Sequence, residues 1–165
     1  PMTYVLITPA HNEVDYIKLT IQSMIVQTKL PLKWVIVSDG SIDGTDDIVK
    51  KYLQAYSWIE LVQMPERKER HFAGKVMAFN AGYERVKYLN YDIIGNLDAD
   101  LSFEKDYFEF LLSKFADNPK LGVAGTPFLE DGKHYDFRFA SVSYAIRDTP
   151  RGTACPCCPG PGPAR

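Results

Sequence analysis

The first 149 residues of this 165-residue chain contain no cysteine, which excludes a disulfide framework there and fits a reducing compartment. No stretch of about 18 consecutive apolar residues occurs, so the sequence predicts no transmembrane helix. Charge of one sign is not in excess, because the formal net charge is −2. The near-neutral balance argues against a nucleic-acid partner held by bulk charge. We therefore expect a cytoplasmic location, or the cytoplasmic face of a membrane if a longer parent exists.

Three common active-site motifs are also missing. No G-x-G-x-x-G follows the first predicted strand, which argues against a dinucleotide oxidoreductase. No Walker A sequence exists, because Val76 follows Gly74 and Lys75 and the upstream glycine is absent. There is no G-x-S-x-G elbow of the α/β-hydrolases either.

The composition of the body is that of a folded protein. Hydrophobic residues make up 45% of the chain and charged residues 24%, which is too apolar for a disordered chain. The length predicts one domain or part of one. Pro1 precedes Met2, so we expect a fragment of a longer protein.

The carboxyl-terminal residues differ sharply from this body. Between Pro150 and Arg165, 11 of the 16 residues are proline, glycine or cysteine. All three cysteines of the chain lie here, but Cys-Pro-Cys-Cys has no second ligand pair, so composition favours a disordered tail over a zinc site. A lost reading frame near Arg147 is the other explanation. We therefore expect one folded domain over 1–146 and a tail over 147–165.

Short apolar runs alternate with amphipathic segments along the body. The spacing of the apolar residues predicts helices after Ile17, Thr45, Gly74 and Asp106, with Thr45 and Asp106 as caps. The predicted strands are 4–8, 34–38, 59–63, 92–97 and 121–126, and an exposed strand is expected around 137–141. This alternation predicts an α/β fold with a mostly parallel sheet and helices on both faces.

Polar and acidic residues follow three of these strands directly. They occupy 9–13 after the first strand, 39–41 after the second, and 98–100 after the fourth. Parallel sheets bind ligands beyond the carboxyl ends of their strands. We therefore expect these residues to meet at one edge of the sheet and to form the functional site.

Asp98 and Asp100 are the candidate metal ligands. Two carboxylates at this spacing offer hard oxygen ligands to Mg²⁺ or Mn²⁺, although Asp-x-Asp after a strand also serves to cap a turn. Lys75 is poorly placed for the dipole of a helix that begins at Gly74, which suggests contact with a diphosphate. Both readings of each residue, functional and structural, remain open from the residues alone. The three histidines are scattered and are expected to be structural or surface residues.

Four motifs in order resemble the family 2 glycosyltransferases, which have the nucleotide-diphospho-sugar (GT-A) fold. The motifs are Thr8–Glu13, Val37–Thr45, Gly74–Gly82 and Leu97–Asp100. The resemblance covers about residues 3–130 and implies an inverting transfer of a sugar from a nucleoside diphosphate, UDP- or GDP-linked, assisted by Mg²⁺ or Mn²⁺. It also implies that the domain over 1–146 binds the nucleotide sugar and is incomplete at its C-terminal side, where the acceptor-binding half of the family would follow.

The resemblance also implies roles for individual residues. Pro9, Ala10, Asn12 and Glu13 would form the floor of the nucleotide pocket, and Asp39 would contact the base or ribose. Lys75 would lie near the nucleotide, and Asp98 would face the donor sugar or ribose. Asp100 would be the metal ligand, with Asp98 as a second candidate.

Two departures from the family pattern matter, the first for nucleotide binding and the second for catalysis. The family usually has two acids before Gly40 and Ser41, and here the first is Ser38. The family's general base is a carboxylate downstream of the metal motif, in the acceptor-binding half. After residue 125 this chain offers only four acids, none in a recognisable motif, so we assign no base: Glu130, Asp131, Asp136 and Asp148.

Two other functions are compatible with the sequence. Asp98 to Ser102 resembles the aspartate motif of haloacid-dehalogenase-like phosphatases, with Asp98 as nucleophile and Asp100 as acid/base. That family places the motif on its first strand, and here it follows the fourth. The other alternative is a non-catalytic nucleotide-binding fragment that lacks the base. The acceptor is not specified by the sequence.

Overall fold

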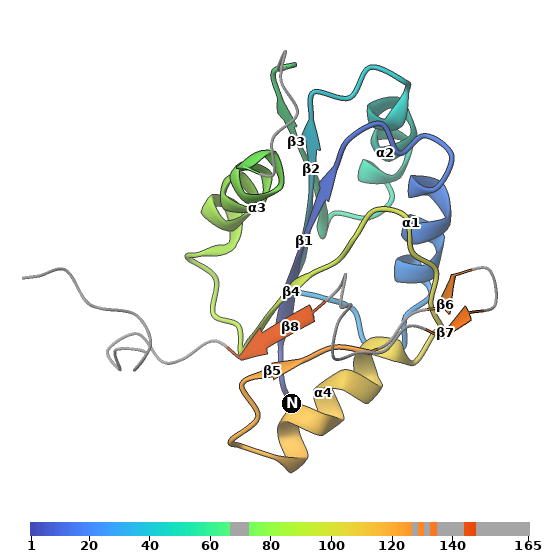
Figure 1. Cartoon of the computed structure of the whole chain (residues 1–165). Helices are drawn as coiled ribbons and strands as arrows, with labels where there is room; N and C mark the ends of the chain where they lie inside the picture. The colour runs from blue at the N-terminus through green and yellow to red at the C-terminus, as the bar shows by residue number, and fades with distance from the viewer. Residues whose placement is uncertain (67–72, 127–128, 131–132, 135–143, 148–165) are drawn as a thin grey trace, which may run out of the picture.

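A computed structural model describes residues 1–66, 73–126, 129–130, 133–134 and 144–147 (Figure 1). Its strands are β1 (Tyr4–Ala10), β2 (Lys33–Asp39), β3 (Ile59–Met64), β4 (Ile93–Asn96), β5 (Val123–Ala124), β6 (Leu129–Glu130), β7 (Lys133–His134) and β8 (Tyr144–Arg147). Its helices are α1 (Ile17–Ile25), α2 (Thr45–Leu53), α3 (Ala73–Val86) and α4 (Tyr107–Asp117). The predicted alternation of strands and helices is confirmed.

The main sheet has six strands in the order β3-β2-β1-β4-β8-β5. The first four are parallel neighbours, whereas β8 is antiparallel to both β4 and β5. The sheet is therefore mixed, with a parallel part that matches the predicted α/β class. The parallel part brings the carboxyl ends of β1, β2 and β4 to the same edge, because β1 lies between the other two.

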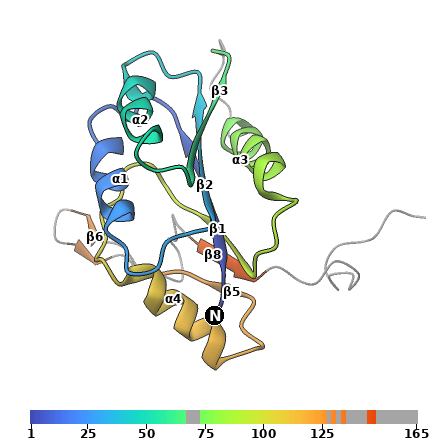
Figure 2. The ribbon, with the colours of Figure 1, turned by 180° about the vertical axis from the view of Figure 1, so that it is seen from behind.

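The sheet separates two apolar cores, and both faces carry helices (Figures 1 and 2). Side chains alternate along a strand, so Leu6 of β1 faces the core shared with α1 and α2, while Val5 and Ile7 face the core shared with α3. Burial on both faces explains why β1 and β2 are nearly continuous apolar runs. Of the two tryptophans, Trp34 is fully buried and Trp58 is half-buried.

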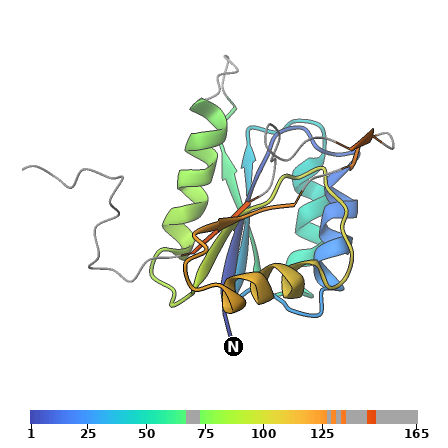
Figure 3. The ribbon, with the colours of Figure 1, turned by 60° about the horizontal axis from the view of Figure 1, so that its bottom comes forward.

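Helices α3 and α4 close the molecule on different sides (Figure 3). Helix α3 lies against β1 and β2 at close range, because a Cβ added at Gly82 would be 2.6 Å from Cγ2 of Ile7. Helix α4 packs across the lower end of the sheet, where the ring of Phe108 stacks on Tyr4 with centroids 5.0 Å apart. The glycine at 82 is therefore a packing requirement of the helix–sheet contact.

Several predicted boundaries are corrected by the structure. The fifth strand contains only Val123 and Ala124, which pair with Ile146 and Ala145 of β8. Asp106 occupies the N-cap position of α4 without a side-chain capping bond. Thr45 is the first residue of α2 and not its cap; Gly44, at φ 100°, is at the N-cap position.

Some predictions lie outside the described residues, namely the exposed strand around 137–141 and the character of 148–165. Arg147, which the predicted division assigns to the tail, lies in β8 and donates to the carbonyls of Phe115 and Asn118 at the end of α4. The division into a domain and a tail stays a prediction. In the part of the chain that the structure describes, none of the helices has the length and apolarity that crossing a membrane requires.

Candidate functional site

The candidate site lies at the edge where the parallel strands end, as the sequence predicts. Pro9 and Ala10 are the last residues of β1 and pair with Val37 and Ser38 of β2. Ala10 is 3% exposed and its methyl group belongs to the core, so only its backbone is available at the edge. The loops that follow β1 and β2 form the upper rim in Figure 1.

These two loops are fastened to each other by hydrogen bonds. The backbone N–H of Asn12 donates to Oγ of Ser41 at 3.1 Å, and the side-chain oxygen of Asn12 accepts from the N–H of Ile42 at 2.9 Å. The N–H of Glu13 donates to Oγ1 of Thr45 at 2.8 Å. Asn12 adopts φ 54°, a conformation that asparagine tolerates better than most residues. The predicted nucleotide floor thus consists of two loops, those after β1 and β2, that are bonded to each other without a ligand. We refer to this pair of loops as the doubled loop.

Asp43 also belongs to this rim, although the sequence motifs alone assigned it no role. Its carboxylate accepts from the N–H of Val14 at 3.0 Å, from the N–H of Thr45 at 3.0 Å and from the Thr45 hydroxyl at 2.6 Å. Although burial opposes the charge, these hydrogen bonds hold the pKa of Asp43 below its usual value. The available signal was an Asp two residues before a Thr that opens a helix, which is a typical Asx-turn arrangement.

Asp39 ends β2 beside this rim, half-buried, in register with Met64 of β3. Its backbone carbonyl accepts from Nδ1 of His11 at 2.6 Å, and Nε2 of the same ring lies 3.2 Å from the Asn12 amide nitrogen. His11 therefore ties the end of β1 to the end of β2, which fits the structural role expected of it. The next residue, Gly40, has φ 65°, and a Cβ there would lie 2.6 Å from Cα of Glu66.

The acidic segment after β4 lies next to α3. The side chain of Asp98 is 13% exposed. Its carboxylate forms an ion pair with Lys75 and accepts a hydrogen bond from Nζ at 2.8 Å. Lys75 is the third residue of α3 and its side chain is 52% exposed. Burial raises the pKa of Asp98, and Asp100 adds to the rise, while the Lys75 bond and Asn96 oppose it. Lys75 therefore lies beside the predicted donor site and partly neutralises it.

Glu13 joins the rim of β1 to the acids of β4 electrostatically. Burial raises the pKa of Glu13, and the negative charges of Asp100, Asp43 and Asp98 raise it further. Asp100 itself is exposed. Acidic side chains that follow β1, β2 and β4 therefore lie close enough to form one negatively charged region at the edge of the sheet.

This arrangement fits a divalent cation whose coordination shell is completed by substrate oxygens. Among residues 1–66, 73–126 and the three short described strands, no three His, Cys, Asp or Glu side chains enclose a metal position. Mg²⁺ typically takes only one or two carboxylates and fills its remaining positions with waters and substrate phosphates. The like charges that raise the pKa values of Glu13 and Asp98 are what a cation beside Asp98 and Asp100 would relieve.

A general base stays unassigned. Glu130 lies in β6, in the two-stranded sheet with β7, and nothing is described of its side chain. The other three downstream acids named above lie outside the described residues.

Comparison with protein families gives one match, to the model described as Glycosyl transferase family 2, over residues 5–161. The chain is similar to the poly-beta-1,6-N-acetyl-D-glucosamine synthase of Staphylococcus aureus strain MSSA476, with 28% identity over 136 residues. The match covers 82% of this chain and 31% of that protein. The synthase of Staphylococcus epidermidis is 27% identical over 143 residues, covering 83% and 32%. The chain thus spans about a third of the length of these curated relatives.

Solved structures share the fold. Residues 1–349 of Staphylococcus aureus TarS, in complex with UDP-GlcNAc, superpose with a TM-score of 0.64 at 19% identity, over 82% of this chain and 37% of that one. The mannosyltransferase PcManGT from Pyrobaculum calidifontis, in complex with GDP-Man and Mn²⁺, gives a TM-score of 0.65 at 19% identity, over 87% and 44%. At these identities the likeness concerns the fold alone.

Proposed function

Because the chain belongs to glycosyl transferase family 2, we propose that it forms the donor-binding part of an inverting glycosyltransferase that uses a nucleoside-diphosphate sugar and a divalent metal. One observation carries the proposal. Glu13 follows β1, whereas Asp98 and Asp100 follow β4, and the parallel pairing of β1 with β4 brings these acids to the same edge of the sheet. Solved neighbours with this fold were crystallised with UDP-GlcNAc and with GDP-Man and Mn²⁺, which supports a nucleotide sugar as the ligand class.

The nucleoside occupies the doubled loop in this proposal. Asp39 accepts hydrogen bonds from base N–H or ribose O–H groups, because an ionised carboxylate is purely an acceptor. Asn12 and Glu13, with the backbone of Pro9 and Ala10, form the floor beneath it. The hydrogen bonds between the two loops fix this floor before the ligand arrives, which lowers the ordering cost of binding.

The diphosphate and the donor sugar lie over the acids of β4. Lys75 contacts the diphosphate, and its exposed side chain can leave Asp98 to do so. Asp98 then faces the ribose or the donor sugar. Asp100, with Asp98 as the second candidate, would hold Mg²⁺ or Mn²⁺. When bound, such an ion supplies Lewis-acid neutralisation of the diphosphate charge.

The transfer itself is a single displacement at the anomeric carbon. The acceptor hydroxyl oxygen forms the new glycosidic bond from the face opposite the nucleotide, and the bond from that carbon to the diphosphate oxygen breaks. The nucleoside diphosphate leaves with the bonding electron pair, and the hydroxyl proton passes to a base that we do not assign. The acceptor is unknown, and the cytoplasmic location expected from the sequence stays a prediction.

The phosphohydrolase alternative is not favoured. The family match covers most of the chain, and the Asp98 to Ser102 segment follows β4 and not the first strand. A phosphatase would lose turnover on Asp98→Asn with an aryl phosphate substrate. The proposed transferase part has no such turnover to lose.

Calorimetric titration with UDP and GDP, each with and without Mn²⁺, tests the proposal directly. We expect at least one nucleotide to bind and Mn²⁺ to strengthen its binding. Asp100→Asn removes a proposed direct ligand of the cation. It should therefore reduce the Mn²⁺ enhancement of nucleotide binding by up to about 100-fold. Asp92→Asn is the matched control, since Asp92 bonds Thr3 at the opposite end of β4. Absence of binding for both nucleotides would overturn the proposal.

The non-catalytic alternative is separated by a second measurement. Slow release of free sugar from a nucleotide sugar, with water as the acceptor, would show that the chain retains bond-breaking chemistry. Binding without any release, also in the presence of Mn²⁺, would identify a donor-binding fragment without turnover.

A further inference from the structure

Two polar side chains of helix α1 lie on a face that should be apolar, and a third follows just past the end of the helix. Thr20 is completely buried among Ile17, Ile21 and Met24, and Ser23 is half-buried. Thr20 and Ser23 share one face of α1. Gln27, two residues after the helix ends at Ile25, is 6% exposed. Threonine is a poor residue for a helix interior, so this row of polar side chains requires an explanation beyond helix formation.

All three side chains bond the backbone of the segment that follows β4. Oγ1 of Thr20 donates to the carbonyl of Ala99 at 2.8 Å and accepts from the N–H of Leu101 at 3.1 Å. Oγ of Ser23 accepts from the N–H of Phe103 at 3.3 Å. A threonine hydroxyl in a helix commonly bonds a carbonyl of its own preceding turn, whereas here it bonds another segment on both sides.

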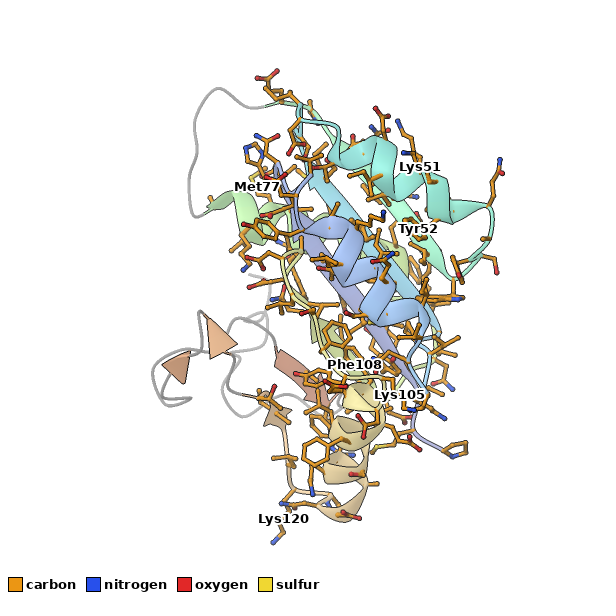
Figure 4. The ribbon with its side chains drawn as sticks, turned by 90° about the vertical axis from the view of Figure 1, so that its right-hand side faces the viewer. Lys51, Tyr52, Met77, Lys105, Phe108 and Lys120 are labelled. Atoms are coloured by element: carbon orange, nitrogen blue, oxygen red, sulfur yellow. The ribbon has the colours of Figure 1, made fainter. Side chains whose placement is uncertain are left out.

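Gln27 completes the row at the start of α4. Its amide nitrogen donates to the carbonyl of Glu104 at 2.8 Å, and its amide oxygen accepts from the N–H of Phe108 at 3.1 Å. Figure 4 shows Lys105 and Phe108 beyond the lower end of α1, where this contact lies. The segment from Ala99 to Phe108 leaves the sheet after β4, so α1 and Gln27 supply the hydrogen-bond partners that a neighbouring strand would otherwise give.

Thr20 has the most specific position in this row. The two backbone groups that it bonds belong to the residues immediately before and after Asp100. Ala99 is 3% exposed and Leu101 packs against the core, whereas Asp100 is exposed. Fixing both neighbours inward leaves the Asp100 side chain directed outward with little freedom to turn.

We propose that Thr20 is a positioning residue: its hydroxyl fixes the peptide groups on both sides of Asp100 and thereby directs that carboxylate toward the donor diphosphate and its cation. The proposal rests on the proposed function. It makes a helix on the α1–α2 face of the sheet responsible for the strength of cation-dependent donor binding, although Thr20 itself contacts neither ligand.

The test is the ratio of UDP affinities with and without Mn²⁺, measured by calorimetry on the whole chain. Thr20→Val removes the hydroxyl and keeps the branched shape, and we expect it to reduce the Mn²⁺ enhancement about tenfold, as is typical when a residue that orients a metal ligand is removed. UDP affinity without Mn²⁺ should stay that of the wild type, because the nucleotide floor is held by other residues. Thr20→Ser keeps the hydroxyl and should restore the enhancement.

Thr8→Val is the matched control. Thr8 is also completely buried, but its hydroxyl accepts from Nε1 of Trp34 at 2.8 Å and not from the backbone beside Asp100. It should lose stability without losing the Mn²⁺ enhancement. An equal loss of UDP affinity with and without Mn²⁺ in Thr20→Val would overturn the inference, and so would an unchanged enhancement.

Failure of the proposed function gives a different result. A wild-type chain that binds neither UDP nor GDP overturns that function, and this inference with it. If Thr20→Val does not fold, Thr20→Ala replaces it, because it also removes the hydroxyl that bonds Ala99 and Leu101 but puts no methyl group in its place. A selective decrease of the Mn²⁺ enhancement in Thr20→Ala would support the inference, and no decrease would overturn it.

Discussion

The two parts of the functional edge are held in place by different means. The loops after β1 and β2 bond each other directly, through Asn12, Asp43 and Thr45. The segment after β4 has no such partner loop among the described residues and is bonded by Thr20 of α1 and by Gln27, which follows the end of that helix. The predicted nucleoside floor is therefore self-supporting, whereas the predicted cation ligands depend on a helix.

Because the two parts are held differently, we expect that nucleotide binding and cation binding can be weakened separately. A change in the doubled loop should act on UDP affinity whether or not Mn²⁺ is present. A change along the inward face of α1 should act mainly on the Mn²⁺ enhancement. The variants below are ordered by the size of their expected effect on stability.

Gly40→Ala should have the largest effect. The new Cβ would lie 2.6 Å from Cα of Glu66, and the residue must keep φ 65°. The left-handed conformation and the backbone clash together should lower the free energy of unfolding by about 3 kcal/mol. Urea unfolding measures the loss, with Gly122→Ala as control because nothing lies within 4 Å of a Cβ there. Equal midpoints for the two variants would contradict the close approach of β2 and the end of β3.

Gln27→Leu should rank second. It leaves the buried N–H of Phe108 and the carbonyl of Glu104 without their side-chain partner, which should cost about 2 kcal/mol. The Mn²⁺ enhancement of UDP binding should fall along with the stability. Gln22→Leu, at an exposed position of α1, is the control for both measurements. A stability loss with full enhancement would limit the role of α1 to Thr20.

Asp43→Ala should have a smaller effect on stability, about 1 kcal/mol, because its carboxylate, which precedes the N-cap residue Gly44, accepts from the N–H of Thr45 in the first turn of α2. The same change frees the N–H of Val14, so UDP affinity should fall equally with and without Mn²⁺. The hydrogen bonds lower the pKa of Asp43, so its contribution is present above pH 3.8 and is lost as the pH falls through the lowered value. A loss confined to the Mn²⁺-bound state would contradict the separation of the two parts.

Glu13→Gln should have the smallest effect on stability. It concerns both parts of the edge, because Glu13 lies in the loop after β1 and interacts with the acids after β4. The pKa of Glu13 is raised from 4.5 on folding, so its ionisation lowers the free energy of unfolding as the pH rises from 4.5 through the raised value. Glu13→Gln should remove this decline and be slightly more stable than the wild type at pH 7, by less than about 1 kcal/mol. Urea unfolding at several pH values above 4.5 measures it. Identical pH profiles would show that Glu13 does not share the charge of the acids after β4.

Much of this fold follows from local patterns. The apolar run of β1 and the helical spacing of Ile17, Ile21 and Met24 predict their elements because burial on one or both faces imposes those periods. The location of the acids after β4 was also predictable, since parallel strands end at one edge. The extent of β5 was not, because among the described strands it pairs only with β8, which comes more than 20 residues later in the chain.

The order of strands, turns and acids along the chain is enough to predict which residues collect at the edge. The contacts that hold those acids in place become visible only in the folded structure. Thr20 and Ala99 are 79 residues apart, and no local pattern indicates that a helix hydroxyl meets the backbone beside Asp100. Such a contact exists because packing α1 on the sheet brings a polar helix face against a segment whose peptide groups need partners.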